Sequence, residues 1–164
     1  MNEEYRIRTA HMEDLEKITR VEAVCFPEAE AAGYETMKGR LAAYPSHFFV
    51  MEQGGEIIGF INGMATEEEM IRDEMFADPG LHREDGAWQA VFGLDVLPEY
   101  RRQGRAAQLM EHLIADARRA GRKGCILTCK KKLLSYYEKF GYVNCGVSES
   151  VHGGAVWYDM RLTF

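Results

Sequence analysis

Apolar and polar residues alternate along the chain with two different periods, and each period predicts a type of secondary structure. Over the N-terminal part these periods predict a strand, two helices and two further strands, in residues 5–9, 11–26, 34–44, 47–53 and 56–65. Pro27 and Pro45 end the two helices, because proline cannot continue a helix. Gly54 and Gly55 separate the last two strands and predict a β-hairpin.

Strands and helices alternate over the rest of the chain. Strands are predicted over 87–96, 124–130, 142–150 and 154–164, and helices over 105–120 and 132–140. The acidic segment 66–86, broken by Pro79 and Gly80, has two interpretations: an inserted helix and loop over an opening in the sheet, or a plain surface helix. Strands that first pair in a hairpin and later alternate with helices predict an α/β (α+β) fold, with a mixed sheet covered by helices on both faces.

Length and composition indicate a globular protein of one domain. The chain of 164 residues and 18.7 kDa predicts a single domain over 1–164. Hydrophobic residues make up 46% and no apolar run is long enough to cross a bilayer, so no membrane partner is expected. The polar N-terminus is not typical of a signal peptide, and four cysteines without a metal-binding spacing predict reduced thiols, a cytoplasmic protein and no metal.

The charge balance narrows the possible partners. A net charge of -6 and a pI of about 5.4 argue against nucleic acid as a partner, since nucleic-acid binding usually needs a broad basic face. Any anion must therefore be bound by a local basic patch.

Arg101, Arg102 and Arg105 surround Gly104 between the strand 87–96 and the helix 105–120. The first turn of a helix leaves backbone N–H groups unpaired, which makes a site for an anion. The segment lacks the Gly-Lys-Ser/Thr of a Walker A loop and the three glycines of a dinucleotide fingerprint. On spacing alone, a phosphate cradle and a tight turn with a solvated basic rim remain equal interpretations.

Two motifs in order give a family resemblance. The segment RRQGRA (101–106) resembles the pyrophosphate-binding motif of the GNAT superfamily of acyl-CoA-dependent N-acetyltransferases, and LTCKKKLLSYYEKFGY (127–142) is similar to its closing helix and strand. Together with EAVCFPEAEA (22–31), the chain most resembles the arylalkylamine, serotonin-type subgroup. The resemblance implies a mixed, mostly antiparallel seven-stranded sheet that splays between strands 4 and 5.

The same resemblance implies acetyl transfer from acetyl-CoA to a primary amine, such as an arylalkylamine or another small amine. It assigns coenzyme binding to two segments, Leu94, Asp95 and Val96 on a strand and Arg102, Gln103, Gly104, Arg105, Ala106 and Ala107 at the loop and helix start. Tyr137 is the implied general acid that protonates the leaving thiolate, and its alternative is a tyrosine that only fills the core. A monomer and a homodimer are both compatible with the sequence.

The general base is left open. Vertebrate arylalkylamine enzymes carry two strand histidines, and Ala90 and Phe92 stand at the matching positions here. Candidates for the base are His152, a chain of water, and the carboxylates Glu67, Glu68, Glu69, Asp73 and Glu74.

The amine pocket is assigned to the segment after the first helix. Glu28 and Glu30 there either attract a cationic amine or are only solvated, and Phe26 is expected to pack against an aromatic ring of the amine. His152 is a further candidate contact. Two other functions remain open: a protein or peptide N-acetyltransferase, and a non-catalytic module that binds acyl-CoA.

Overall fold

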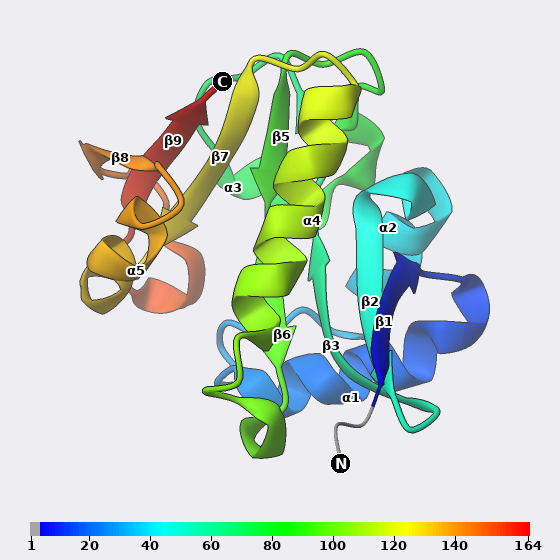
Figure 1. Cartoon of the computed structure of the whole chain (residues 1–164). Coiled ribbons are helices and arrows are strands. Elements are labelled where there is room, and N and C mark those ends of the chain that lie inside the picture. The colour runs from blue at the N-terminus through cyan, green and yellow to red at the C-terminus, as the bar shows by residue number, and fades with distance from the viewer. Residues whose placement is uncertain (1–3) are drawn as a thin grey trace. The chain divides into compact units, whose positions relative to one another are not determined.

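A computed structural model describes residues 4–164, which form two compact units. Of the described residues, the first unit comprises those up to Asn62 together with Gly93–Leu113, and the second comprises Gly63–Phe92 and Ile114–Phe164. Helix α4 (Arg105–Arg119) begins in the first unit and ends in the second (Figure 1). The single domain expected over 1–164 stays a prediction, and each unit is described by itself.

The first unit contains a four-stranded antiparallel sheet. Its strands follow the order β1-β2-β3-β6, with bounds Tyr5–Thr9, Phe48–Gln53, Glu56–Asn62 and Gly93–Val96. The predicted β2–β3 hairpin is confirmed, and Gly54 and Gly55 form its turn with φ values of 61° and 79°. Glycine suits both positions because a positive φ is unfavourable for residues that carry a Cβ.

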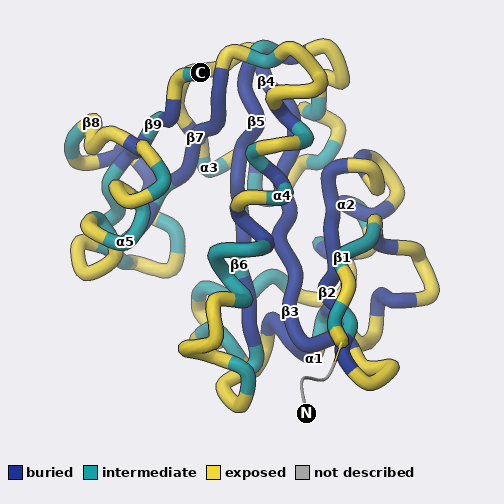
Figure 2. Tube along the Cα trace, viewed as in Figure 1, coloured by how far each residue is buried: buried dark blue, intermediate teal, exposed yellow. Residues whose placement is uncertain are grey.

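Helices cover both faces of this sheet. Helices α1 (Leu15–Cys25) and α2 (Tyr34–Ala43) form a core with Phe48, Val50 and Phe60. Phe49 points to the other face and contacts His112 of α4, with ring centroids 4.7 Å apart, because successive strand residues face opposite sides. Figure 2 shows β2 and β3 as almost continuously buried. Helix α1 begins later than predicted, because a 3-10 turn (Met12–Asp14) precedes it.

The second unit contains a five-stranded mixed sheet. Its strands follow the order β4-β5-β7-β9-β8, and only β5 and β7 run parallel. The bounds are Ala65–Thr66 for β4, Trp88–Val91 for β5, Gly124–Cys129 for β7, Val143–Val147 for β8 and Tyr158–Thr163 for β9. Two short helices, α3 (Asp73–Ala77) and α5 (Leu134–Glu138), complete the unit together with short 3-10 turns.

The predicted α+β class is correct, but the strands differ from the seven in one sheet that were expected. Within residues 4–164 there are nine strands in two sheets, because two predicted strands are each interrupted. The strand 56–65 divides at Gly63 into β3 and β4, and the strand 87–96 divides at Phe92 into β5 and β6. The buried amide of Gln89 donates hydrogen bonds to the carbonyls of Gly63 and Ala90, at 2.8 and 2.9 Å, which satisfies backbone groups at the interruptions.

Phe60 provides a test of the first core. Its side chain is fully buried, and its ring centroid lies 5.4 Å from that of Phe48. We expect Phe60→Ala to lower the free energy of unfolding by about 3–5 kcal/mol, because it removes apolar contacts and leaves a cavity. Urea denaturation measures the change. The exposed Val24 of α1 is the control, and an equal loss in Val24→Ala would contradict this assignment of the core.

Candidate active site

The basic loop adopts an unusual backbone conformation directly before α4. Arg102 and Gly104 have φ values of 62° and 77°, in the left-handed region. A Cβ on Gly104 would meet no atom within 4 Å, so the conformation of the chain, and not lack of space, favours glycine. Left-handed residues in a tight loop turn neighbouring N–H groups toward a common side, an arrangement that binds anions.

The start of α4 adds further donors. Its first backbone hydrogen bond runs from the N–H of Gln108 to the carbonyl of Gly104, over 3.1 Å. The N–H groups of Arg105, Ala106 and Ala107 precede this bond, so they have no acceptor within the helix. They also lie at the positive end of the helix dipole. Loop and helix start therefore combine into a local anion-binding geometry on an acidic chain.

The three arginines of this segment have different surroundings. Arg101 donates from Nε to the carbonyl of Val96 at 2.8 Å. Arg105 donates to Oε1 of Gln53 at 3.0 Å, and its guanidinium lies 4.0 Å above the ring of Tyr5. The exposed side chain of Arg102 makes no hydrogen bond or ion pair within residues 4–164. Arg102 is thus the arginine best able to meet an anion.

Strand β6 carries the other predicted coenzyme residues, Leu94, Asp95 and Val96. It is an edge strand of its sheet and pairs with β3 along one side. Its second backbone edge has no strand partner in the described part of the first unit. Edge N–H and C=O groups of this kind can pair with an extended ligand.

The side chain of Asp95 does not face that edge. It is buried, with 1% of its surface exposed, and its carboxyl lies near that of Glu22 of α1, since a Cβ on Gly93 would be 3.2 Å from Oδ1 of Asp95 and 3.7 Å from Oε1 of Glu22. Burial, and next the adjacent carboxyl of Glu22, raise the pKa of Asp95 well above its ordinary range.

The backbone N–H and C=O of Asp95 face β3, because Leu97 bonds to Ile58 and the bonded pairs alternate along the two strands, so Leu94 and Val96 form the open edge. The coenzyme role of Asp95 stays a prediction.

Tyr137 lies on α5 in the second unit. It is half-buried, and its ring meets Tyr136 and Tyr142 edge to face, with centroids 5.2 and 6.1 Å apart. Tyr142 is fully buried, whereas Tyr137 keeps part of its surface exposed. Its role as general acid stays a prediction.

His152 lies in the turn between β8 and β9 and stacks on Phe76 of α3, with ring centroids 5.0 Å apart. Phe76 also packs against Phe92, at 5.1 Å. Asp73 of α3 accepts hydrogen bonds from the hydroxyl of Ser150 and from the N–H of Val151. Within the second unit, His152 therefore lies one aromatic ring away from Phe92, where the resemblance expects a histidine.

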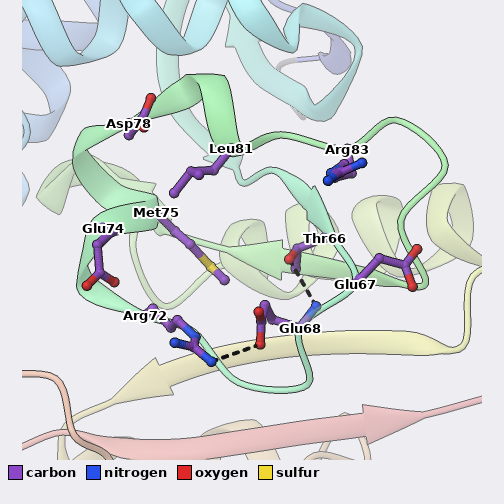
Figure 3. A pocket seen from close by; sticks show the side chains of 9 residues that line it. All are labelled: Thr66, Glu67, Glu68, Arg72, Glu74, Met75, Asp78, Leu81 and Arg83. Carbon is purple, nitrogen blue, oxygen red and sulfur yellow. Dashed lines mark hydrogen bonds and ion pairs between the residues drawn. The ribbon is translucent and has the colours of Figure 1, made fainter.

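The acidic insertion forms a pocket of about 460 Å³ (Figure 3). Glu67, Glu68 and Glu74 line it, and Glu68 pairs with Arg72 at 3.4 Å. Glu69 does not line the pocket, and its backbone carbonyl instead accepts from Arg161. Asp73 binds the turn before His152, so the five candidate carboxylates do not form one group. The insertion contains the short helix α3 and a 3-10 turn (Pro79–Leu81) joined by loops, which agrees with an inserted helix and loop better than with a plain surface helix. Its predicted place over an opening in the sheet stays a prediction.

Of the residues predicted to line the amine pocket, Phe26 and Glu30 are half-buried and Glu28 is exposed. The loop that carries them is held by Glu22, whose Oε2 accepts from the N–H of Ala32 at 2.9 Å. Glu22 was not among the site residues predicted from the sequence. Its helical spacing from Leu15 and Ile18, on the buried stripe of α1, was the available signal.

Comparison with known proteins identifies the family. The model of the acetyltransferase (GNAT) domain matches residues 14–164, which is nearly the whole chain. The chain belongs to the GNAT acetyltransferase family. Its enzyme class is accordingly acetyl-CoA-dependent acyl transfer.

Solved GNAT structures agree with this fold. The GphF GNAT-like decarboxylase in complex with isobutyryl-CoA gives a TM-score of 0.84 at 21% identity, covering 96% of this chain and 98% of that one. The ribosomal-protein-S18-alanine N-acetyltransferase of Escherichia coli gives a TM-score of 0.73 at 18% identity, covering 98% of this chain and 94% of that one. Naa20 of Chaetomium thermophilum in complex with a bisubstrate analogue gives a TM-score of 0.71 at 25% identity, covering 97% of this chain and 86% of that one.

These comparisons support the GNAT family but not the arylalkylamine subgroup that the sequence favoured. Within residues 4–164, none of the helices combines the length and apolar character that spanning a membrane requires.

Asp95 predicts how stability depends on pH. Because its pKa is raised in the folded state, the folded protein holds a proton that the unfolded chain releases above about pH 4. The free energy of unfolding should therefore fall as pH rises from about 4 toward the raised pKa of Asp95 in the folded protein, by up to about 1.4 kcal/mol per pH unit. Asp95→Asn removes the titration and should flatten the profile.

Urea unfolding from pH 5 to 9 measures this slope. The control is Asp85→Asn, at an exposed position, which should keep the slope of the unmodified protein. Equal slopes in the protein and in Asp95→Asn would show that Asp95 does not hold the proton.

Proposed function

We propose that the chain transfers the acetyl group of acetyl-CoA to a primary amine, with Tyr137 as general acid. The observation that carries this proposal is the left-handed loop at Arg102 and Gly104 leading directly into α4, in a chain of the GNAT family. An open phosphate-binding loop of this kind suits a coenzyme with a pyrophosphate group.

The chain's groups fit coenzyme A in two places. The backbone N–H groups from Arg102 to Ala107 would hold the pyrophosphate, with the Arg102 guanidinium adding charge. On the edge of β6 that has no strand partner, the backbone groups of Leu94 and the N–H of Val96 would pair with the amide groups of the pantetheine arm, with Asp95 between them on the strand. The coenzyme itself supplies an activated thioester.

The proposed reaction has no covalent enzyme intermediate. The neutral amine nitrogen attacks the thioester carbonyl carbon, so a C–N bond forms and the C–S bond breaks. A backbone N–H near Val96 would stabilise the negative charge on the carbonyl oxygen. Tyr137 gives its phenolic proton to the leaving sulfur, and a base takes a proton from the amine nitrogen.

His152 is the side chain that best suits the role of this base. Imidazole accepts protons near neutral pH more readily than other side chains do. Its ring stacks on Phe76, which packs against Phe92, and Asp73 holds the turn that carries it. Water could relay the proton if the amine does not reach the ring.

The acceptor is proposed as a primary amine bound by the loop that carries Phe26, Glu28 and Glu30, with an arylalkylamine as the aromatic candidate. Carboxylates attract a cationic amine, and Phe26 offers apolar and cation–π contact. A peptide N-terminus is the second candidate, favoured by the 25% identity to Naa20, whose structure holds a bisubstrate analogue. Thiol release with aromatic amines, polyamines and short peptides distinguishes these acceptors, and no turnover with any of them would favour the non-catalytic module.

Tyr137→Phe tests the general acid. Removing the phenolic proton should lower kcat about 100-fold or more, because the leaving thiolate then has no positioned donor. Thiol release under saturating amine and acetyl-CoA is the measurement. Tyr136→Phe, on the same helix, should change kcat less than about threefold, since a neighbour about 100° around the helix faces elsewhere. Unchanged turnover in Tyr137→Phe would remove Tyr137 from the mechanism.

Gly104→Asp tests the coenzyme site. A side chain on a left-handed residue, and its negative charge, should weaken coenzyme A binding about tenfold or more in calorimetric titration. Gly54→Asp is a matched control, because Gly54 also has a positive φ and open surroundings. Equal affinities of a folded Gly104→Asp variant and the control would place the pyrophosphate elsewhere.

A further inference from the structure

Glu22 connects helix α1 to the loop that follows it. Its Oε2 accepts a hydrogen bond from the N–H of Ala32 over 2.9 Å, ten residues further along the chain. The residue is 95% buried, since only 5% of its surface is exposed. A buried carboxyl bonded to a loop N–H fixes the loop more strongly than a solvated one, because water does not compete for the bond.

The second oxygen of Glu22 faces strand β6 at a glycine. A Cβ on Gly93 would lie 3.7 Å from Oε1 of Glu22, 3.2 Å from Oδ1 of Asp95 and 3.3 Å from Nδ2 of Asn62. Three polar side chains from α1, β6 and β3 therefore converge above one backbone position. Any larger residue at Gly93 would crowd them.

The contact between Glu22 and Asp95 requires a proton. Two ionised carboxylates both accept hydrogen bonds and repel one another, so they cannot pair unless one of them is protonated. Among the described residues, no donor bonds to either oxygen of Asp95 or to Oε1 of Glu22. A single proton shared by the pair satisfies both observations.

The surrounding charges support one proton on the pair. Arg40 of α2 faces Asp95 and favours its ionised form, and it donates to Oδ1 of Asn62 at 3.2 Å. One buried arginine can balance one carboxylate but not two. Protonation of the other makes the cluster neutral, which the interior favours.

Two further groups border the cluster. Cys25 of α1 donates from Sγ to the carbonyl of Val96 at 3.4 Å, and burial raises the pKa of this thiol. Arg101 donates to the same carbonyl and lies beside the thiol. Neither supplies a negative charge while the thiol is neutral, so the carboxyl pair is the group whose ionisation changes the charge.

We propose that Glu22 is a positioning residue for the amine acceptor, and that the proton it shares with Asp95 holds the loop 26–33 against strand β6. The part of this inference that concerns the acceptor rests on the proposed function, in which that loop binds the amine. When the pair loses its proton, the two carboxylates repel and the bond from Glu22 to Ala32 is weakened. The loop then separates from β6 and the acceptor binds less tightly.

Amide hydrogen exchange tests the loop without requiring catalysis. In the unmodified protein, the protection factor of the Ala32 amide should fall about tenfold or more as pH rises and the shared proton is lost. Glu22→Gln and Asp95→Asn each keep a donor and an acceptor at every pH, so their Ala32 protection should stay constant. Glu22→Ala should lose protection at all pH values. An unchanged pH dependence in both isosteric variants would overturn the proposal.

Steady-state kinetics then tests the acceptor, using any amine that supports turnover. Glu22→Ala should raise the KM for the amine about tenfold, with the KM for acetyl-CoA changed less than about twofold. At each pH, the KM of the unmodified protein for the amine is divided by the KM of Asp95→Asn, which removes the effect of amine deprotonation. This KM ratio should grow with pH. Glu16→Gln, at an exposed position of α1, is the control and should match the unmodified protein.

The two experiments separate two failures. If Ala32 protection follows the prediction but no amine is acetylated, the shared proton is supported and the proposed function is not. If turnover occurs with equal effects of Glu22→Ala on both KM values, Glu22 does not position the acceptor.

Discussion

The interruption of the strand at Phe92 is the constraint on which the arrangement of this protein depends. Before it, β5 pairs with β4 and β7, and after it, β6 pairs with β3. One run of apolar residues thus contributes to two sheets, and β6 keeps one backbone edge without a strand partner in the described chain. A continuous strand would have bonded along its whole length. The buried Gln89 amide lets the interruption exist without leaving the carbonyls of Gly63 and Ala90 unpaired.

The same segment positions the polar cluster of the first unit. Gly59 of β3 lies so close to β6 that a Cβ there would be 2.4 Å from the carbonyl of Asp95. This approach turns the backbone of Asp95 toward β3, and its side chain lies under α1 next to Glu22. The side chain of Asp95 is therefore buried in the polar cluster, and the open edge of β6 is formed by the backbone groups of Leu94 and Val96.

Periodicity predicted most elements, since the hairpin, the long helix after Gly104 and the C-terminal strands appear near the expected places. It did not predict the division into two sheets, because hydrophobic pattern reports burial and not which strand is the partner. The basic loop was found because its glycine and arginines are adjacent in sequence. The cluster of Glu22 and Asp95 was not, because 73 positions separate them and a glutamate in an amphipathic helix is usually solvated. Asp95 within an apolar strand and Glu22 on the buried stripe of α1 were the local signs.

The surroundings of the three loop arginines affect how strongly dissolved salt would weaken phosphate binding at the site. Arg101 and Arg105 bond within the first unit, and the remaining donors are largely backbone N–H groups fixed by Arg102 and Gly104. Dissolved ions screen exposed side-chain charges over about 8–10 Å at ordinary ionic strength, but they screen short hydrogen bonds from a fixed backbone much less. A phosphate held mainly by peptide groups would thus keep most of its affinity in concentrated salt.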